Sequence, residues 1–234
     1  MLKGANALVE FINPEKGLPS GSYDLWEERF GIHSYSTAAV IAGLRATINA
    51  AGVMGTEKNI NAKEIRKWQE TADRCEEALL TLWRPSLNRF VRSLNGNAYQ
   101  FEDHEVDISL LGISVPFKII PPSDDKMVTM AKTLEEQLTS PKIGGIKRYV
   151  HDQYIGGNPW VLCTLWLALY YIEIKEYSKA KSLLKWTIEH RTRLSLLPEQ
   201  VNKDSGEPAW VIPLTWSHAM YIMTVIGLAR AGKI

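Results

Sequence analysis

The chain has 234 residues, of which 45% are hydrophobic and 23% are charged, and its net charge is +1. This composition is typical of a soluble globular protein, and the balanced charge argues against binding to nucleic acid or to an anionic membrane surface. The most apolar stretch, residues 159–172, is too short to span a bilayer, and the N-terminus has no signal-peptide pattern, so we expect a cytoplasmic protein. Cys75 and Cys163 are too few for a disulfide framework and are expected to be buried thiols.

Helical periodicity is frequent along the chain, and strand patterns are nearly absent. A helix that is apolar nearly all round is predicted from residue 33 to about residue 51. The next helix, residues 61–82, is amphipathic; Asn61 can cap its start, and Glu64 completes a capping box. A second helix that is apolar nearly all round is predicted over residues 106–115.

The second half of the chain continues this alternation. Amphipathic helices are predicted over residues 123–138 and 178–188. Helices over residues 159–172 and 213–229 are apolar, and the first of them has Asn158 as its N-cap, followed by proline. A helix that is apolar all round must be buried on all sides, whereas an amphipathic helix buries one stripe.

The alternation of apolar and amphipathic helices predicts the architecture. We expect an all-α protein of about seven helices, with the apolar helices in an inner layer and the amphipathic helices in an outer layer. These helices would form a single helical domain over residues 1–234. No strong internal repeat is visible, so a regular solenoid is not expected.

Two acidic segments lie in loops that precede apolar helices. The first, residues 22–29, contains Glu27 and Glu28 beside Trp26, and the second, Leu-Pro-Glu-Gln, contains Glu199. A pair of carboxyl groups in a concave site is what acid/base cleavage of a glycosidic bond needs: one protonated to assist the leaving oxygen and one ionised to activate water. Taken alone, Glu27 and Glu28 could also favour a helix dipole, and Glu199 could be a solvated loop residue.

A third segment, from Arg148 to Trp160, lies just before and at the start of the apolar helix that is predicted from residue 159. If the inner helices all run in the same direction, this segment and the two acidic segments emerge at one end of the array and form one site. Arg148 alone could equally be a surface charge. The aromatic side chains near these loops either pack in the core or stack against sugar rings; they are Tyr23, Trp26, Tyr149, Tyr154, Trp160, Trp210 and Trp216.

Other kinds of chemistry have little support in the sequence. The five histidines show no metal-ligand spacing, so no metal site is predicted. The paired glycines at 144–145 and 156–157 follow no strand, so a phosphate-binding loop is not expected. No cofactor is therefore predicted.

Together, these motifs resemble the catalytic domain of family 15 glycoside hydrolases, which comprise glucoamylases and glucoamylase-like trehalases. The resemblance covers essentially the whole chain in the family's order. The segments that carry it are Gly17-Leu18-Pro19, Ser22–Arg29, Arg148-Tyr149, Asp152, Tyr154, Gly156–Trp160, Leu197–Gln200 and Pro213–Ala219.

The resemblance implies an (α/α)6 toroid with its active site at one end, and an inverting glycoside hydrolase that releases glucose from the non-reducing end of an α-1,4-glucan or of trehalose. It implies that Glu27 is the general acid and that Glu199 is the general base. Glu28, Arg148 and the main chain near Trp26 would bind the terminal glucose. Trp160 would line the pocket.

The chain also departs from the family pattern. Members carry an N-terminal β-sandwich and the first part of the toroid before the acid motif, whereas Glu27 lies near the start of this sequence. We therefore expect the C-terminal part of the catalytic domain, a partial toroid with exposed apolar flanks. Its partner would be an N-terminal half polypeptide or a second copy. The alternatives are a truncated reading frame and a non-catalytic paralogue that serves as a carbohydrate-binding or protein-interaction module.

Overall fold

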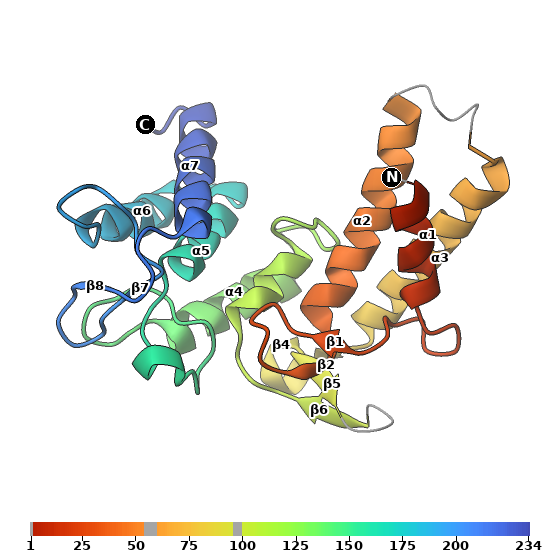
Figure 1. Cartoon of the computed structure of the whole chain (residues 1–234), viewed down its shortest axis with the longest axis horizontal. Coiled ribbons are helices and arrows are strands. Elements are labelled where there is room, and N and C mark those ends of the chain that lie inside the picture. The colour runs from red at the N-terminus through yellow and green to blue at the C-terminus, as the bar shows by residue number, and fades with distance from the viewer. Residues whose placement is uncertain (1, 54–59, 96–99) are drawn as a thin grey trace. The chain divides into compact units, whose positions relative to one another are not determined.

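A computed structural model describes residues 2–53, 60–95 and 100–234 (Figure 1). The chain divides into two compact units. Unit 1 comprises Met1–His104 with Gly112–Ile120, and unit 2 comprises Glu105–Leu111 with Pro121–Ile234. Within the described ranges the chain is mostly helical, which confirms the all-α prediction.

Three helices of unit 1 pack together: α1 (Leu2–Phe11), α2 (Ser34–Val53) and α3 (Ala62–Leu80) (Figure 1). The predicted cap of α3 is confirmed, because Asn61 accepts a hydrogen bond from the Lys63 N–H group at 2.9 Å. Helix α3 is amphipathic as predicted, because it buries one stripe that contains Trp68, Ala72, Cys75 and Leu79. Burial raises the pKa of the Cys75 thiol to about 12. Helix α1 was not predicted from the sequence.

Unit 1 also contains a few short strands, which the sequence did not reveal. Four of them form an antiparallel sheet in the order β1-β2-β5-β6, and β3 pairs with β4. Each has only two to four residues, too few for an alternating pattern to show in the sequence. The strands are β1 (Ser22–Tyr23), β2 (Phe30–His33), β3 (Trp83–Arg84), β4 (Arg89–Phe90), β5 (Ser93–Asn95) and β6 (Phe101–Asp103), and the 3-10 helix η2 (Pro85–Leu87) lies between β3 and β4.

Unit 2 is built around one buried helix. Helix α5 (Val161–Glu173) packs against both α6 (Tyr177–Glu189) and α7 (Thr215–Arg230) (Figure 1). Ten of its 13 residues are buried, which confirms that it is an inner helix. Helix α4 (Asp125–Leu138) and helix α6 each bury one face, so both helices are amphipathic as expected. The remaining elements of the unit are the 3-10 helix η4 (Tyr154–Gly156) and the paired strands β7 (Gln200–Val201) and β8 (Pro208–Ala209).

Three predicted helices differ from the structure. Helix α2 was expected to be buried nearly all round, but only seven of its 20 residues are buried. Residues 106–115 form the short 3-10 helix η3 (Ile108–Ile113) rather than an α-helix. Helix α7 begins at Thr215 and is not buried on all sides. It buries one face against α5, while its opposite face leaves apolar side chains exposed. We call this exposed set the α7 face; its members are Trp216 (37% exposed), Ile222 (55%), Met223 (49%) and Ile226 (43%).

Within residues 2–53, 60–95 and 100–234, no helix is both long enough and apolar enough to cross a bilayer.

The two faces of α7 should respond differently to a charge. We expect Ile226→Lys to change the free energy of unfolding by no more than about 0.5 kcal/mol, because the side chain is exposed. Leu228→Lys should cost about 3 kcal/mol or more, because it places an ammonium group in a fully buried position. Urea denaturation of both variants checks this, and equal losses would contradict the assignment of the faces.

Candidate functional site

In unit 2, the segment that contains Glu199 runs beside the start of α5. The Val161 N–H group donates to the Glu199 carbonyl at 3.0 Å, and the Val201 N–H group donates to the Pro159 carbonyl at 3.0 Å. Trp160 and Gln200 form an antiparallel bridge between these two bonds. The main chain therefore fixes Glu199 next to Trp160, two of the residues predicted for the site.

Arg148 is buried, with 3% of its surface exposed, which excludes the interpretation as a surface charge. It forms a bidentate ion pair with Asp152, with Nε–Oδ2 at 2.9 Å and Nη2–Oδ1 at 2.8 Å. The guanidinium carbon also lies 4.7 Å from the ring centre of Trp160, 5.1 Å from that of Tyr154 and 5.2 Å from that of Tyr149. The ion pair and the aromatic faces together stabilise a buried positive charge.

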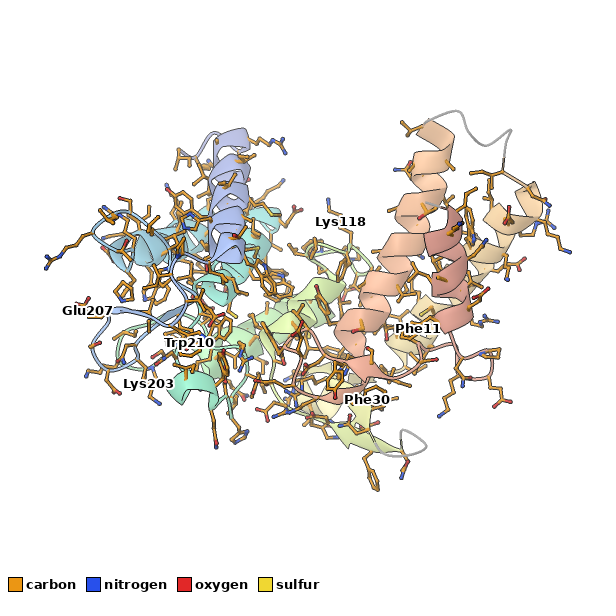
Figure 2. The ribbon with its side chains drawn as sticks, in the orientation of Figure 1. Phe11, Phe30, Lys118, Lys203, Glu207 and Trp210 are labelled. Atoms are coloured by element: carbon orange, nitrogen blue, oxygen red, sulfur yellow. The ribbon has the colours of Figure 1, made fainter. Side chains whose placement is uncertain are left out.

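The aromatic cluster continues outward from Trp160. Tyr154 contacts Trp160 with ring centres 6.0 Å apart, and it contacts Trp210 edge to face at 6.1 Å. Trp210 directly follows β8 and is 54% exposed (Figure 2). Exposed aromatic faces beside hydrogen-bonding groups suit the flat apolar faces of sugar rings. The sequence marked these aromatic residues as candidates but could not show that Tyr154 joins the other two.

Two hydrogen-bonded amide side chains, those of Gln200 and Asn158, hold the half-buried carboxyl group of Glu199. Gln200, fully buried, donates from Nε2 to Oε2 of Glu199 at 3.0 Å, and its own Oε1 accepts from Asn158 Nδ2 at 3.1 Å. Asn158 also donates to the Ile155 carbonyl and accepts from the Lys203 N–H group. Asn158 is therefore not the N-cap of α5, which corrects that prediction: its side chain joins loops instead, and the helix begins after Trp160.

The surroundings of Glu199 shift its pKa in opposing directions. Burial raises the pKa, whereas the hydrogen bond from Gln200 and the positive charge of Arg148 lower it, and the net direction is upward. Glu199 thus keeps its proton to a higher pH than an exposed glutamate does. As the pH rises through that pKa, the carboxylate forms with one oxygen already oriented by Gln200.

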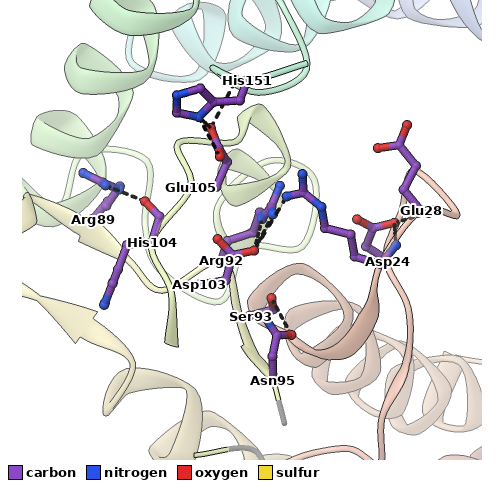
Figure 3. A network of polar contacts seen from close by, with 11 residues as sticks. Asp24, Glu28, Arg89, Arg92, Ser93, Asn95, Asp103, His104, Glu105 and His151 are labelled. Carbon is purple, nitrogen blue, oxygen red and sulfur yellow. Dashed lines mark hydrogen bonds and ion pairs between the residues drawn. The ribbon is translucent and has the colours of Figure 1, made fainter. Parts of the chain in front are cut away.

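In unit 1, the predicted acid motif is the turn of the β1–β2 hairpin. The Glu27 N–H group donates to the Asp24 carbonyl at 3.1 Å, and the Asp24 side chain accepts from the Glu28 N–H group at 2.9 Å (Figure 3). Glu27 has a φ of 60°, in the left-handed region that a residue other than glycine rarely adopts. Trp26 is buried, while Glu27 and Glu28 are exposed. The turn therefore directs adjacent residues to different surroundings.

An ion-pair network ties this turn to the sheet. Arg29 lies 3.7 Å from Asp103 of β6, and Asp103 is also bound by Arg92, whose Nε donates to Oδ2 at 3.0 Å (Figure 3). Arg92 is 3% exposed, so its charge depends on Asp103 for compensation. Sequence reasoning missed both residues, because they meet only through the pairing of β5 with β6.

The structure thus groups the predicted site residues within the two units. Trp26, Glu27 and Glu28 lie together in unit 1, and Arg148, Trp160 and Glu199 belong to unit 2. In the part of the chain that the structure describes, no group of three or more His, Cys, Asp or Glu residues could hold a metal ion. What the arrangement offers is carboxyl groups beside aromatic faces and a fixed positive charge.

Comparison with known proteins agrees with this chemistry. The model of the glycosyl hydrolases family 15 matches residues 6–188. An uncharacterized glycosyl hydrolase of Methanocaldococcus jannaschii is 34% identical over 218 residues, which are 87% of this chain and 33% of that protein. Trehalase 2 of Sulfolobus acidocaldarius is 27% identical over 206 residues, 88% of this chain and 34% of that protein. The chain therefore belongs to glycosyl hydrolase family 15.

Solved structures show the same fold. The family 15 glucoamylase of Hypocrea jecorina superposes with a TM-score of 0.75 at 19% identity, over 98% of this chain and 46% of that one. A glycosidase solved in complex with glucose gives a TM-score of 0.75 at 23% identity, over 90% of this chain and 56% of that one. The predicted fold class, part of an (α/α)6 toroid, is confirmed. The chain spans about a third of the length of the curated relatives and about half of the solved chains.

The contribution of Gln200 can be measured without substrate. Gln200→Met keeps the volume of the side chain but removes the donor to Glu199, so the pKa of Glu199 should rise further above its ordinary value. Titration of the carboxyl groups by 13C NMR checks this. Gln69→Met removes a comparable donor from exposed Asp73 in unit 1 and should leave Glu199 unchanged. An unaltered Glu199 titration in Gln200→Met would contradict the claim that the hydrogen bond from Gln200 lowers the pKa of Glu199.

Proposed function

We propose that this protein takes part in the hydrolysis of a terminal α-glucosidic bond, with Glu27 as the general acid and Glu199 as the general base. The observation that carries the proposal is the setting of Glu199. One oxygen of its half-buried carboxyl group is held by Gln200, and the buried charge of Arg148 acts on that group. The main chain of Glu199 lies beside Trp160. A carboxylate held in this way can orient a water molecule for attack.

In the proposed reaction, Glu27 donates its proton to the glycosidic oxygen, and the bond from that oxygen to the anomeric carbon breaks. Glu199 takes a proton from a water molecule, whose oxygen attacks the anomeric carbon from the opposite face and inverts it. This geometry requires the two carboxyl groups to lie roughly 6.5–9.5 Å apart, so that one water molecule fits. Glu27 and Glu199 belong to different units, so their approach across one cavity is part of the proposal.

The remaining predicted residues would bind the terminal glucose. Arg148 brings a positive charge and hydrogen-bond donors beside Glu199, and Trp160 lines the pocket with an apolar face. Glu28 and the main chain near Trp26 would bind sugar hydroxyl groups from unit 1. The neighbouring aromatic residues Tyr154 and Trp210 extend the apolar rim towards solvent.

We propose an α-1,4-glucan or trehalose as the substrate. The names of the relatives support this class: trehalases of Sulfolobus acidocaldarius and Mycobacterium tuberculosis, and the glucoamylase of Hypocrea jecorina. These substrates share the terminal glucose and differ in the leaving group. The choice between them therefore depends on contacts outside the residues assigned above.

The two units together would form one catalytic domain, the C-terminal part of the family's toroid, which further helices complete. The support comes from the α7 face, whose apolar side chains are exposed, and from the relatives, which are about three times as long as this chain. Helices from the N-terminal part of the family's catalytic fold would cover this face. Self-association through the same face is the competing outcome.

Substitution of the two glutamates tests the proposal. We expect Glu27→Gln and Glu199→Gln each to lower kcat about 100-fold or more on the preferred substrate, since each removes one proton transfer. Maltose, maltotriose, starch and trehalose are assayed with the protein alone and with the N-terminal part of a family member. NMR of the initial product should show β-glucose.

Glu207→Gln is a matched control, because Glu207 is an exposed glutamate close to Glu199 in sequence (Figure 2). It should retain full activity. Activity that survives in both Glu27→Gln and Glu199→Gln would contradict the hydrolase assignment.

The second candidate function is a non-catalytic module that binds a carbohydrate or a protein. The exposed aromatic rim of Tyr154 and Trp210 and the exposed α7 face favour it, because both are surfaces for binding rather than for bond cleavage. Calorimetry with glucose distinguishes the two candidates. Binding without turnover, both alone and with the N-terminal part of a family member, would support the module.

A further inference from the structure

One histidine contacts the segment that carries Glu199. His218, in the first turns of α7, receives a hydrogen bond from the Leu197 N–H group, with N–Nε2 at 3.0 Å. A backbone N–H group can only donate, so Nε2 must carry a lone pair. The ring is therefore neutral and carries its proton on Nδ1. This tautomer is assigned from the hydrogen bond, because the Leu197 N–H group must be the donor.

Two further bonds join the same segment to α7. Ser217 donates from Oγ to the Pro198 carbonyl at 2.8 Å, and the Leu214 N–H group donates to the Leu197 carbonyl at 3.1 Å. The residues immediately before Glu199 are thus bound to the start of α7 at three points. Of the three acceptors, only the His218 nitrogen can take up a proton and so lose its lone pair.

Protons can reach this histidine. A cavity of about 350 Å3 is lined by His218 and Leu197, together with Ile188, Arg191, Ser195 and Tyr221. Arg191, which follows α6, and Tyr221 of α7 are the other charged or titratable side chains that line it. Helices α5 and α6 also pack against α7. The titratable residues of α5 are Cys163, Tyr170, Tyr171 and Glu173, and those of α6 are Tyr177, Lys179, Lys181, Lys185 and Glu189.

Of the titratable residues in α5, Cys163 lies closest to His218 in position along the helix axis. The Ile172 side chain of α5 occupies the space that a Cβ atom at Gly227 of α7 would approach, and the starts of both helices adjoin the Glu199 segment, so the two helices run in parallel. Burial raises the pKa of the Cys163 thiol well above its usual range, so the thiol stays neutral through the range in which histidine titrates. Neither Cys163 nor the cavity brings a carboxylate to compensate a charged His218.

We propose that His218 is a pH-sensitive positioning residue for the Glu199 segment. In its neutral form it accepts the Leu197 N–H group and holds the segment to α7. Once protonated, the ring has N–H groups on both nitrogens and no acceptor, so this bond is lost. The consequence for catalysis rests on the role proposed for Glu199, but the switch itself does not.

The direction of the pH effect follows from this chemistry. The hydrogen bond is present while Nε2 of His218 keeps its lone pair, and it is lost when a falling pH puts a proton on that nitrogen. Glu199 gains its own proton on the acid side as well, and burial has already raised its pKa. Both events would weaken base catalysis in the same direction, so the test must follow the hydrogen bond of Leu197 itself rather than the activity.

Amide hydrogen exchange measures the switch without any substrate. In the wild-type protein, the protection of the Leu197 amide should fall about tenfold between pH 8 and pH 5 after correction for intrinsic exchange, as expected for the loss of one hydrogen bond. The Trp166 amide of α5 serves as an internal reference. In His218→Gln, a side-chain carbonyl can accept at every pH, so protection should not change with pH.

His190 provides the matched control. Its Nδ1 contacts the Trp186 carbonyl at 2.7 Å, so it is a donor, and protonation leaves that bond intact. His190→Gln should therefore retain the pH dependence at Leu197. The 15N shifts of the His218 ring at pH 8 give a second readout in the wild-type protein, independent of whether a variant folds.

Three results would overturn the proposal: a proton on Nε2 at pH 8, protection of Leu197 that is independent of pH, or the same pH dependence in His218→Gln as in the wild-type protein. None of these readouts requires turnover. A failure of the hydrolase assignment would leave them unchanged, so the two failures are distinguishable.

Discussion

The buried ion pair of Arg148 with Asp152 is the interaction on which the candidate site in unit 2 depends. Both side chains are almost fully removed from solvent, and removal of either partner would leave an uncompensated buried charge, a loss of about 3–5 kcal/mol. The ion pair holds residues 148 and 152 of the loop together, and the rings of Tyr149, Tyr154 and Trp160 pack around the guanidinium group. The same charge acts on the pKa of Glu199, so the scaffold and the electrostatics of the site have one origin.

Glu199 shows how packing and polarity are balanced around a single carboxyl group. Burial favours its neutral form, and Gln200 and Arg148 favour its charged form. Because Gln200 is in turn fixed by Asn158, the oriented oxygen depends on residues about 40 positions apart in the chain. The start of α7 holds the same segment from the other side, so rigid elements support Glu199 in two directions.

The helices could be predicted where their signals are local. The cap at Asn61 and the buried stripe of α3 depend on residues a few positions apart, and both are confirmed. Asn158 failed as a cap because its amide joins the distant Gln200 and Lys203. The sequence of α7 showed that the helix is apolar, but not which neighbouring elements cover it. Its exposed face could therefore not be predicted from residues that are close in sequence.

The candidate site, too, could be predicted from the sequence only in part. Residue types and their order suggested Glu27, Arg148 and Glu199, whereas the network of Arg92 and Asp103 needed strand pairing that a sequence does not display. We propose that Glu27 and Glu199 open onto one cavity. The distance between their carboxyl groups in a crystal structure of the protein with glucose bound tests this most directly. We expect roughly 6.5–9.5 Å; carboxyl groups well beyond that distance, or on opposite sides of the helices, would contradict the proposal.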